Sequence, residues 1–287
     1  MNLGILCSGQ LGLKVLKKLA SEYRISFVFT DSNSIEIKEF CADQEFLIFI
    51  GNPRKSNSEK FLATGACDVL LSINYIFLIE DNLIKFPSKY SINIHGSLLP
   101  KYRGRTPHVW AIINNEKKTG ITAHLIDAGC DTGDILEQIE VEICSEDTGA
   151  SILDKFSALY FPLIKSVLYK IENNQLIPTP QNHSKATYFG KRTPDDGHIN
   201  WDWQKERIYN WVRAQAKPYP GAFTYLNDKK VTIDAISFSD DGYNFEVANG
   251  TVLAMDPLKV KTPNGVIKID QFRESIDEII PFKTILR

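Results

Sequence analysis

The N-terminal half of the chain alternates short apolar runs with segments of helical periodicity, and this alternation restricts the fold more than any other feature. The apolar runs lie at 3–7, 25–30, 46–50, 68–73 and 90–95. The helical segments between them lie at 12–20, 34–42 and 56–63. Continuous apolar runs are typical of strands buried on both faces of a parallel sheet. The rhythm therefore predicts an α/β domain with a Rossmann-like, doubly wound, mostly parallel sheet.

The second half of the chain predicts a change of architecture. Strands are expected at 121–127 and 135–143, and a long helix with one apolar face at 148–172. The polar, proline-containing stretch 173–197 marks a boundary, which we place between an N-terminal domain 1–186 and a C-terminal part 187–287. In that part a linker helix at 205–216 precedes a small antiparallel β module, OB-like in size. Three dipeptides predict its hairpins: Asn227-Asp228, Asn249-Gly250 and Asn264-Gly265.

Composition narrows the classes of protein that remain. The 287 residues carry a formal charge of −2, so a dominant nucleic-acid-binding face is not expected. No apolar run approaches the ~20 residues of a membrane span, and the first residues lack the basic start of a signal peptide. Five scattered cysteines without CxxC spacing suit a reducing compartment and no zinc site. We therefore expect a cytoplasmic protein.

Polar side chains follow the apolar run 90–95. Asn93 and His95 are two residues apart and so share a face of the strand, while Asp131 lies in the turn GCDTGD beyond another strand. Ligands of doubly wound folds collect at the carboxyl ends of the strands. A neutral imidazole can act as a general base, an amide can donate to an oxyanion, and a nearby carboxylate raises the pKa of an imidazole. From the residues alone, it is equally consistent that His95 only caps a strand and Asp131 only caps a turn.

The sequence also contains weak signals for a dinucleotide and for a metal ion. The stretch CSGQLG has Cys7 where the dinucleotide fingerprint has its first glycine, which favours a tight strand-to-helix turn over NAD or FAD binding. A metal site from His95 and Asp131 with His124 or His108 matches no compact metal motif, so no metal is predicted.

The stretch SINIHGSLLPKYRGRTPHVWAIINNE resembles the signature of the folate-dependent formyltransferases. The family pattern has N-x-H, then SLLP, then an aspartate in a turn like DAGCDTGD, and all three parts are present. The segment 186–225 resembles the family as well, and it is similar to the formyltransferase domain that acts on UDP-4-amino-4-deoxyarabinose. The resemblance covers most of the chain.

This resemblance implies formyl transfer from N10-formyltetrahydrofolate to an amine. It implies that Asn93 stabilises the oxyanion, that His95 moves the proton and that Asp131 holds the imidazole. It places the folate ligand against two segments and one arginine. These residues are Phe77, Leu78, Ile79, Arg105, Asp127, Ala128, Gly129 and Cys130.

The acceptor amine is the harder choice. The transfer-RNA enzymes of the family carry a basic, glycine-rich insertion where this chain has the acidic segment 31–44. The resemblance therefore favours a nucleotide-linked amino deoxysugar, dTDP-4-amino-4,6-dideoxyglucose first, for O-antigen synthesis by a homodimer. A methionyl-tRNA formyltransferase, a formyltetrahydrofolate hydrolase and a non-catalytic binding protein stay as alternatives. Candidates for the nucleotide contacts are Lys191, Arg192, Tyr209, Arg213 and Tyr219.

Overall fold

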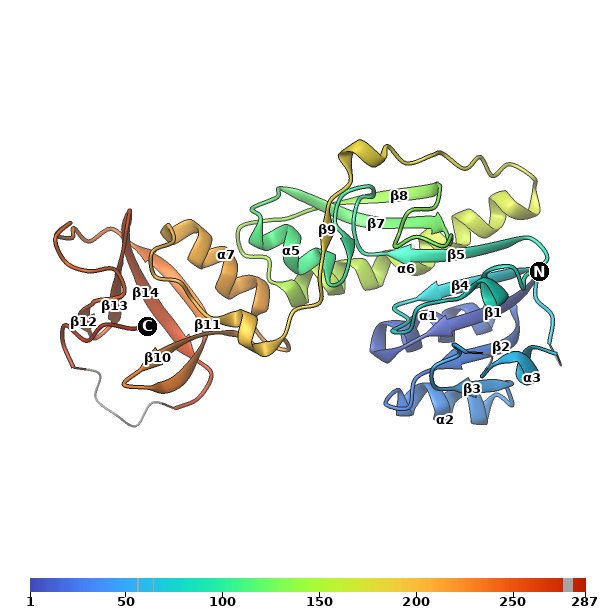
Figure 1. The fold of residues 1–287 in the computed structure, drawn as a ribbon, viewed down its shortest axis with the longest axis horizontal. Coiled ribbons are helices and arrows are strands. Elements are labelled where there is room, and N and C mark those ends of the chain that lie inside the picture. Colours follow the sequence, from blue (N-terminus) through green and yellow to red (C-terminus); the bar gives the residue numbers. More distant parts are fainter. Residues whose placement is uncertain (56, 64, 276–280) are drawn as a thin grey trace. The chain divides into compact units, whose positions relative to one another are not determined.

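The computed structural model describes residues 1–55, 57–63, 65–275 and 281–287, in two compact units (Figure 1). The first unit comprises Met1–Gly104, Gly120–Val141 and Lys155–Tyr188. The second comprises Arg105–Thr119, Glu142–Asp154 and Phe189–Arg287. Two short stretches from within the predicted domain 1–186 thus group with the C-terminal residues. Each unit is described by itself.

A seven-stranded sheet forms the centre of the first unit. Its strands are β1 (Asn2–Cys7), β2 (Arg24–Thr30), β3 (Ile48–Ile50), β4 (Val69–Ile73), β5 (Tyr90–His95), β7 (Lys118–Leu125) and β8 (Ile135–Glu142), in the order β3-β2-β1-β4-β5-β7-β8. The pairs among the first five strands are parallel, whereas β5 and β7 are antiparallel. The predicted mostly parallel, doubly wound sheet is confirmed.

Burial explains why these apolar runs became strands. All five residues of β4 are buried, and so are five of the six in β1, as expected for central strands covered on both faces. Phe27 and Phe29 of β2 pack edge to face with Phe61. The helices around the strands are α1 (Gly9–Glu22), α2 (Ile35–Asp43), α3 (Glu59–Leu62), α4 (Asp81–Ile84) and α6 (Gly149–Glu172).

The strand order reverses at β1, which lies between β2 and β4. In such sheets the crevice beyond the carboxyl ends of the strands receives ligands. His95 is the last residue of β5, the neighbour of β4, and β7 lies on its other side. The chain between them includes the two-residue strand β6 (Arg103–Gly104), which pairs with β9 (Tyr188–Phe189). The sheet thus presents polar side chains at its carboxyl edge.

The second unit contains a five-stranded antiparallel sheet together with α5 (Pro107–Ile113) and α7 (Lys205–Gln215). Its strands are β10 (Ala222–Leu226), β11 (Lys229–Ser239), β12 (Val252–Met255), β13 (Leu258–Thr262) and β14 (Gly265–Phe272), in the order β10-β11-β14-β13-β12. The predicted antiparallel module and linker helix are confirmed.

Two of the three predicted hairpins are present. Asn227 and Asp228, both with left-handed φ, join β10 to β11, and the turn before Gly265 joins β13 to β14. The prediction at Asn249-Gly250 is wrong, because no strand precedes it in 241–250. The backbone of Gly250 instead pairs with distant segments: its N–H donates to Lys261 O, and its carbonyl accepts from Leu286. Contacts remote in sequence decided this turn.

Candidate active site

Asn93, His95 and Asp131 converge at the carboxyl edge of the sheet in the first unit. β5 supplies Asn93 and His95, and the loop between β7 and β8 supplies Asp131. His95 Nδ1 lies 3.6 Å from Asp131 Oδ2. The His95 side chain is 7% exposed and that of Asp131 15%. The three residues singled out in the sequence lie in one polar cluster, in which His95 is buried and Asn93 and Asp131 are partly buried.

The hydrogen bonds of His95 identify its basic nitrogen. Nε2 lies 2.8 Å from the carbonyl oxygen of Tyr102, and a carbonyl can only accept. Nε2 therefore carries the proton in the neutral ring, and Nδ1, which faces Asp131, is the basic atom. Burial lowers the pKa of His95, and the charge of Asp131 opposes this only in part. The expectation of a raised pKa is corrected: the ring is neutral at pH 7.

Asp131 remains charged in spite of its burial. Burial alone raises the pKa of its carboxyl, but His95, His124 and the N–H of Gly104 outweigh that effect and hold the pKa well below its usual range. Gly104 N donates to Oδ2 at 2.9 Å. A fixed carboxylate beside Nδ1 would stabilise the imidazolium that forms when His95 takes up a proton.

Asn93 is held by His124, the residue opposite it on the antiparallel strand β7. Nδ1 of His124 lies 2.8 Å from Leu125 O and donates there, so Nε2 accepts in the neutral ring. When the ring is protonated, Nε2 instead faces Asp131 Oδ1, which lies 3.6 Å away. Nδ2 of Asn93, at 3.1 Å, is the donor to Nε2. This bond fixes which end of the amide is NH2, and the second N–H remains for an oxyanion. From the sequence His124 was a candidate metal ligand only, because its pairing with Asn93 depends on the register of the two strands.

The loop that carries Asp131 is ordered by its own polar groups. Asp127 Oδ1 accepts from Thr132 Oγ1 at 2.6 Å and from Gly129 N at 3.1 Å. At Gly133 an added Cβ would lie 2.0 Å from Leu125 O, so only glycine allows this approach. Asp131 itself has a left-handed φ of 55°. The loop is therefore built to place one carboxylate.

The residues predicted to contact folate lie on exposed loops. Asp127, Ala128, Gly129 and Cys130 are exposed in the Asp131 loop. Phe77, Leu78 and Ile79 lie in the segment between β4 and α4, where Leu78 is 64% exposed. Arg105 is exposed and belongs to the second unit. Their contacts with a ligand stay a prediction.

Four of the five candidate nucleotide contacts are bonded within the second unit. Arg192 lies against the rings of Trp110 and Trp211 and donates to Asp196 O and Gln215. Arg213 donates to the carbonyls of Cys144 and Asp147, Tyr209 to that of Ser145, and Tyr219 pairs with His108. Lys191 is exposed. These side chains have structural roles, and contact with a nucleotide stays a prediction.

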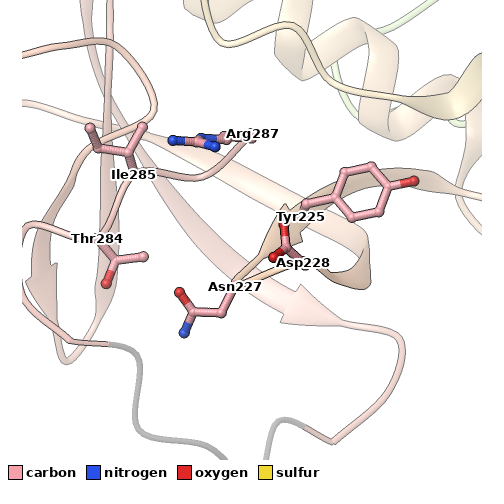
Figure 2. Close-up of a pocket in the computed structure, with 6 residues that line it drawn as sticks. All are labelled: Tyr225, Asn227, Asp228, Thr284, Ile285 and Arg287. Carbon is pink, nitrogen blue, oxygen red and sulfur yellow. The ribbon is translucent and has the colours of Figure 1, made fainter.

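Within the described ranges, no three His, Cys, Asp or Glu side chains are placed to hold a metal ion, and no helix is long and apolar enough to cross a bilayer. A hollow of about 650 Å³ lies in the β module, between the Asn227-Asp228 turn and the C-terminal segment (Figure 2). It is lined by Tyr225, Asn227, Asp228, Thr284, Ile285 and Arg287. This hollow belongs to the second unit, whereas the cluster of Asn93, His95 and Asp131 belongs to the first.

Several known proteins resemble this chain in sequence or in fold. The chain is 33% identical over 272 residues to the bifunctional polymyxin resistance protein ArnA of Wigglesworthia glossinidia brevipalpis, covering 93% of this chain and 40% of ArnA. It resembles the structure of WlaRD, a sugar 3N-formyl transferase solved in the presence of dTDP and 5-N-formyl-THF, with a TM-score of 0.72 at 21% identity, over 96% of this chain and 99% of WlaRD. A 4-N formyltransferase from Francisella tularensis gives a TM-score of 0.70 at 23% identity, over 82% of this chain and 96% of that one.

The formyl transferase family matches residues 14–166 and the formyl transferase C-terminal domain matches 191–287. The chain therefore belongs to the formyl transferase family.

Proposed function

We propose that this chain transfers a formyl group from N10-formyltetrahydrofolate to the amino group of a nucleotide-linked amino deoxysugar. The observation that carries the proposal is the convergence of an oriented amide, a neutral histidine and a charged carboxylate at Asn93, His95 and Asp131. Acyl transfer to an amine needs an oxyanion donor and a group that moves one proton. This cluster supplies both.

In the proposed reaction the folate supplies an activated formyl group, and the chain supplies hydrogen bonds and proton transfer. The free N–H of Asn93 donates to the formyl oxygen as the amine attacks and negative charge develops there. His95 Nδ1 takes the proton that the attacking amine loses, while Nε2–H stays on Tyr102 O. Asp131 offsets the charge of the imidazolium. The same Nδ1–H then donates to N10 as the C–N10 bond breaks.

The proposed binding residues follow the resemblance. The exposed Leu78, with Phe77 and Ile79, would offer an apolar surface to a flat heterocycle, and the loop from Asp127 to Cys130 would offer polar groups. Arg105 would contact the folate as well. For the nucleotide we propose Lys191, Arg192, Tyr209, Arg213 and Tyr219. Among these, Lys191 has an exposed ammonium suited to a diphosphate.

We propose dTDP-4-amino-4,6-dideoxyglucose as the acceptor, for O-antigen synthesis in the cytoplasm, and a homodimer as the working form. The acidic segment 31–44 supports a small acceptor over a transfer RNA, because it holds one lysine against four carboxylates. The chain spans 40% of ArnA, so the activity of the whole ArnA protein is not assigned to it. We also propose that residues 1–186 form the catalytic domain and that residues 187–287 form the linker helix and the C-terminal β module.

The test is incubation with N10-formyltetrahydrofolate and a set of amines, read by mass spectrometry for one added formyl group. The set contains dTDP-4-amino and dTDP-3-amino dideoxysugars, UDP-4-amino-arabinose and methionyl-tRNA. Formylation of one dTDP-4-amino sugar supports the proposal in full. Formylation of the transfer RNA alone would replace the acceptor, and folate turnover without a formylated amine would indicate a hydrolase. His95→Gln is the matched inactive control.

A further inference from the structure

A buried arginine lies behind the catalytic cluster and takes no part in the chemistry described above. Arg103 is 1% exposed, the largest fully buried side chain of the described chain. Its guanidinium donates to Gln181 Oε1 from Nε at 3.2 Å and Nη2 at 2.7 Å. It also donates to His183 Nδ1 and to the hydroxyl of Tyr188, whose ring it lies against. Arginine is almost never fully buried without a carboxylate partner, so this arrangement is unusual for a purely structural residue.

The backbone around Arg103 connects the two catalytic side chains. The carbonyl of Tyr102 accepts from His95 Nε2 at 2.8 Å, and Gly104 N donates to Asp131 Oδ2 at 2.9 Å. The same segment is tied to Thr187, which accepts from Tyr102 N and Arg103 N. Tyr102 has a left-handed φ of 59°, a costly conformation for a residue other than glycine. The positions of the ring and the carboxylate therefore depend on one three-residue segment.

Gln181 connects this segment to the Asp131 loop. Its Oε1 accepts from Arg103, and its Nε2 donates to the carbonyls of Asp131 at 2.9 Å and Gly133 at 2.7 Å. Gln181 is 5% exposed, so all of these bonds lie in a region that excludes most water. One amide thus ties the loop of the carboxylate to the arginine of the bridging segment.

We propose that Arg103 and Gln181 are positioning residues for the reaction, which set the spacing between His95 Nδ1 and the carboxylate of Asp131. This inference rests on the proposed function for its kinetic part only. Without Gln181 the Asp131 loop loses two donors, and without Arg103 the segment 102–104 loses its buried anchor. A misplacement of about 1 Å in a catalytic constellation can cost ~100-fold in rate.

Two substitutions of Gln181 distinguish the role of its Oε1, which accepts from Arg103, from that of its Nε2, which donates to the Asp131 loop. Gln181→Glu keeps an acceptor for Arg103 and loses the donor to the loop, whereas Gln181→Met loses both. Arg103→Met removes the anchor, and Arg103→Met with Gln181→Met removes both partners without leaving a buried charge unpaired. The matched control is Gln215→Met. Gln215 also accepts from an arginine, Arg192, and donates to a carbonyl, that of Trp211, with both partners in the second unit.

The first readout needs no substrate. The charged or titratable groups that act on His95 are Asp131, His124 and Arg103. The Asp131 charge raises the pKa of His95, so a retreating carboxylate must lower it. In ¹⁵N spectra of the five histidines, the His95 titration should move to lower pH in Gln181→Met, in the direction of Asp131→Asn. Gln181→Glu is read by kinetics alone, because its carboxylate offsets the charge of Arg103, which itself lowers the pKa of His95. Gln215→Met should leave the His95 signals in place.

The second readout is kinetic. We expect about 100-fold lower kcat in Gln181→Met, Gln181→Glu and Arg103→Met, with KM within twofold, and no further loss in the double variant. Unchanged His95 signals in folded Gln181→Met would overturn the inference, and so would a double variant with fully additive losses. If no amine is formylated by the parent chain, the proposed function fails and the ¹⁵N readout still decides this inference.

Discussion

Nδ2 of Asn93 lies 3.1 Å from Nε2 of His124, across the antiparallel pair β5 and β7. Because His124 Nδ1 donates to Leu125 O, the neutral histidine accepts from the amide at Nε2. The proposed oxyanion donor is thus oriented by a residue to which the proposed mechanism assigns no proton transfer.

This relationship predicts the effect of replacing His124. His124→Leu removes the acceptor, frees the Asn93 amide to flip and should lower kcat by about tenfold with little change in KM. His124→Gln offers a carbonyl oxygen in its place and should recover part of the loss. Steady-state kinetics on both variants is the measurement. Equal activity in His124→Leu and the parent chain would mean that Asn93 is oriented by other groups.

Asn93 itself should matter more than its partner. Asn93→Ala removes the donor to the developing oxyanion, and loss of one such donor costs about 100- to 1000-fold in kcat. Folate affinity should change little, because the interaction strengthens only in the transition state. Single-turnover formyl transfer and equilibrium folate binding give the two values. A variant that loses folate binding and keeps its single-turnover rate would assign Asn93 to binding.

The pH dependence follows from the lowered pKa of His95. In the proposed reaction the base is the neutral ring, so the fall of kcat/KM that belongs to His95 should begin only below its folded pKa, which lies under 6.5. The acceptor amine must also be unprotonated to attack, so its own titration is measured on the free substrate and separated from the profile. A remaining ascending limb centred at or above pH 6.5 would contradict this assignment.

The same shift has a consequence for stability. Between pH 6.5 and the folded pKa the unfolded chain binds a proton at His95 that the folded chain does not. The free energy of unfolding should therefore decrease as the pH falls through this window. Urea unfolding at several pH values checks this, with His95→Gln as the control that lacks the contribution. Asp131 acts with the same sign at lower pH, below 3.8.

The close approach at Gly133 predicts a loss of stability. In Gly133→Ala the new methyl group would lie 2.0 Å from Leu125 O, and relieving such a clash costs about 1–3 kcal/mol. The Asp131 loop should shift with it, so activity should fall as well. Gly242→Ala is the matched control, because nothing lies within 4 Å of its new Cβ. Urea unfolding that ranks the two variants equally would show that the loop adapts freely.

Arg213 tests whether a predicted nucleotide contact is structural. Arg213→Met removes the donors to the carbonyls of Cys144 and Asp147 and should lower the free energy of unfolding by about 1–2 kcal/mol. Thermal and urea unfolding measure this. A raised KM for the nucleotide sugar without any loss of stability would instead support the nucleotide contact.

The amino-acid sequence by itself determined most of the elements, and its resemblance to the formyltransferases picked out the candidate catalytic side chains. Continuous apolar runs of five or six residues, such as that of β4, are typical of buried strands, and the polar side chains of Asn93, His95 and Asp131 lie at or beyond the ends of two strands. Local chemistry suffices to predict the strands, because hydrophobic period and turn residues act over a few positions. It also sufficed for the Asn227-Asp228 turn, whose two residues accept a left-handed backbone.

Only the tertiary structure decided how the side chains act. The basic nitrogen of His95 is set by the carbonyl of Tyr102, the amide of Asn93 by His124, and the Asp131 loop by Gln181, 50 residues away in the chain. The net pKa of His95 depends on burial, and burial depends on packing among distant segments. These are long-range hydrogen bonds and desolvation, and neither leaves a local pattern in the order of the residues.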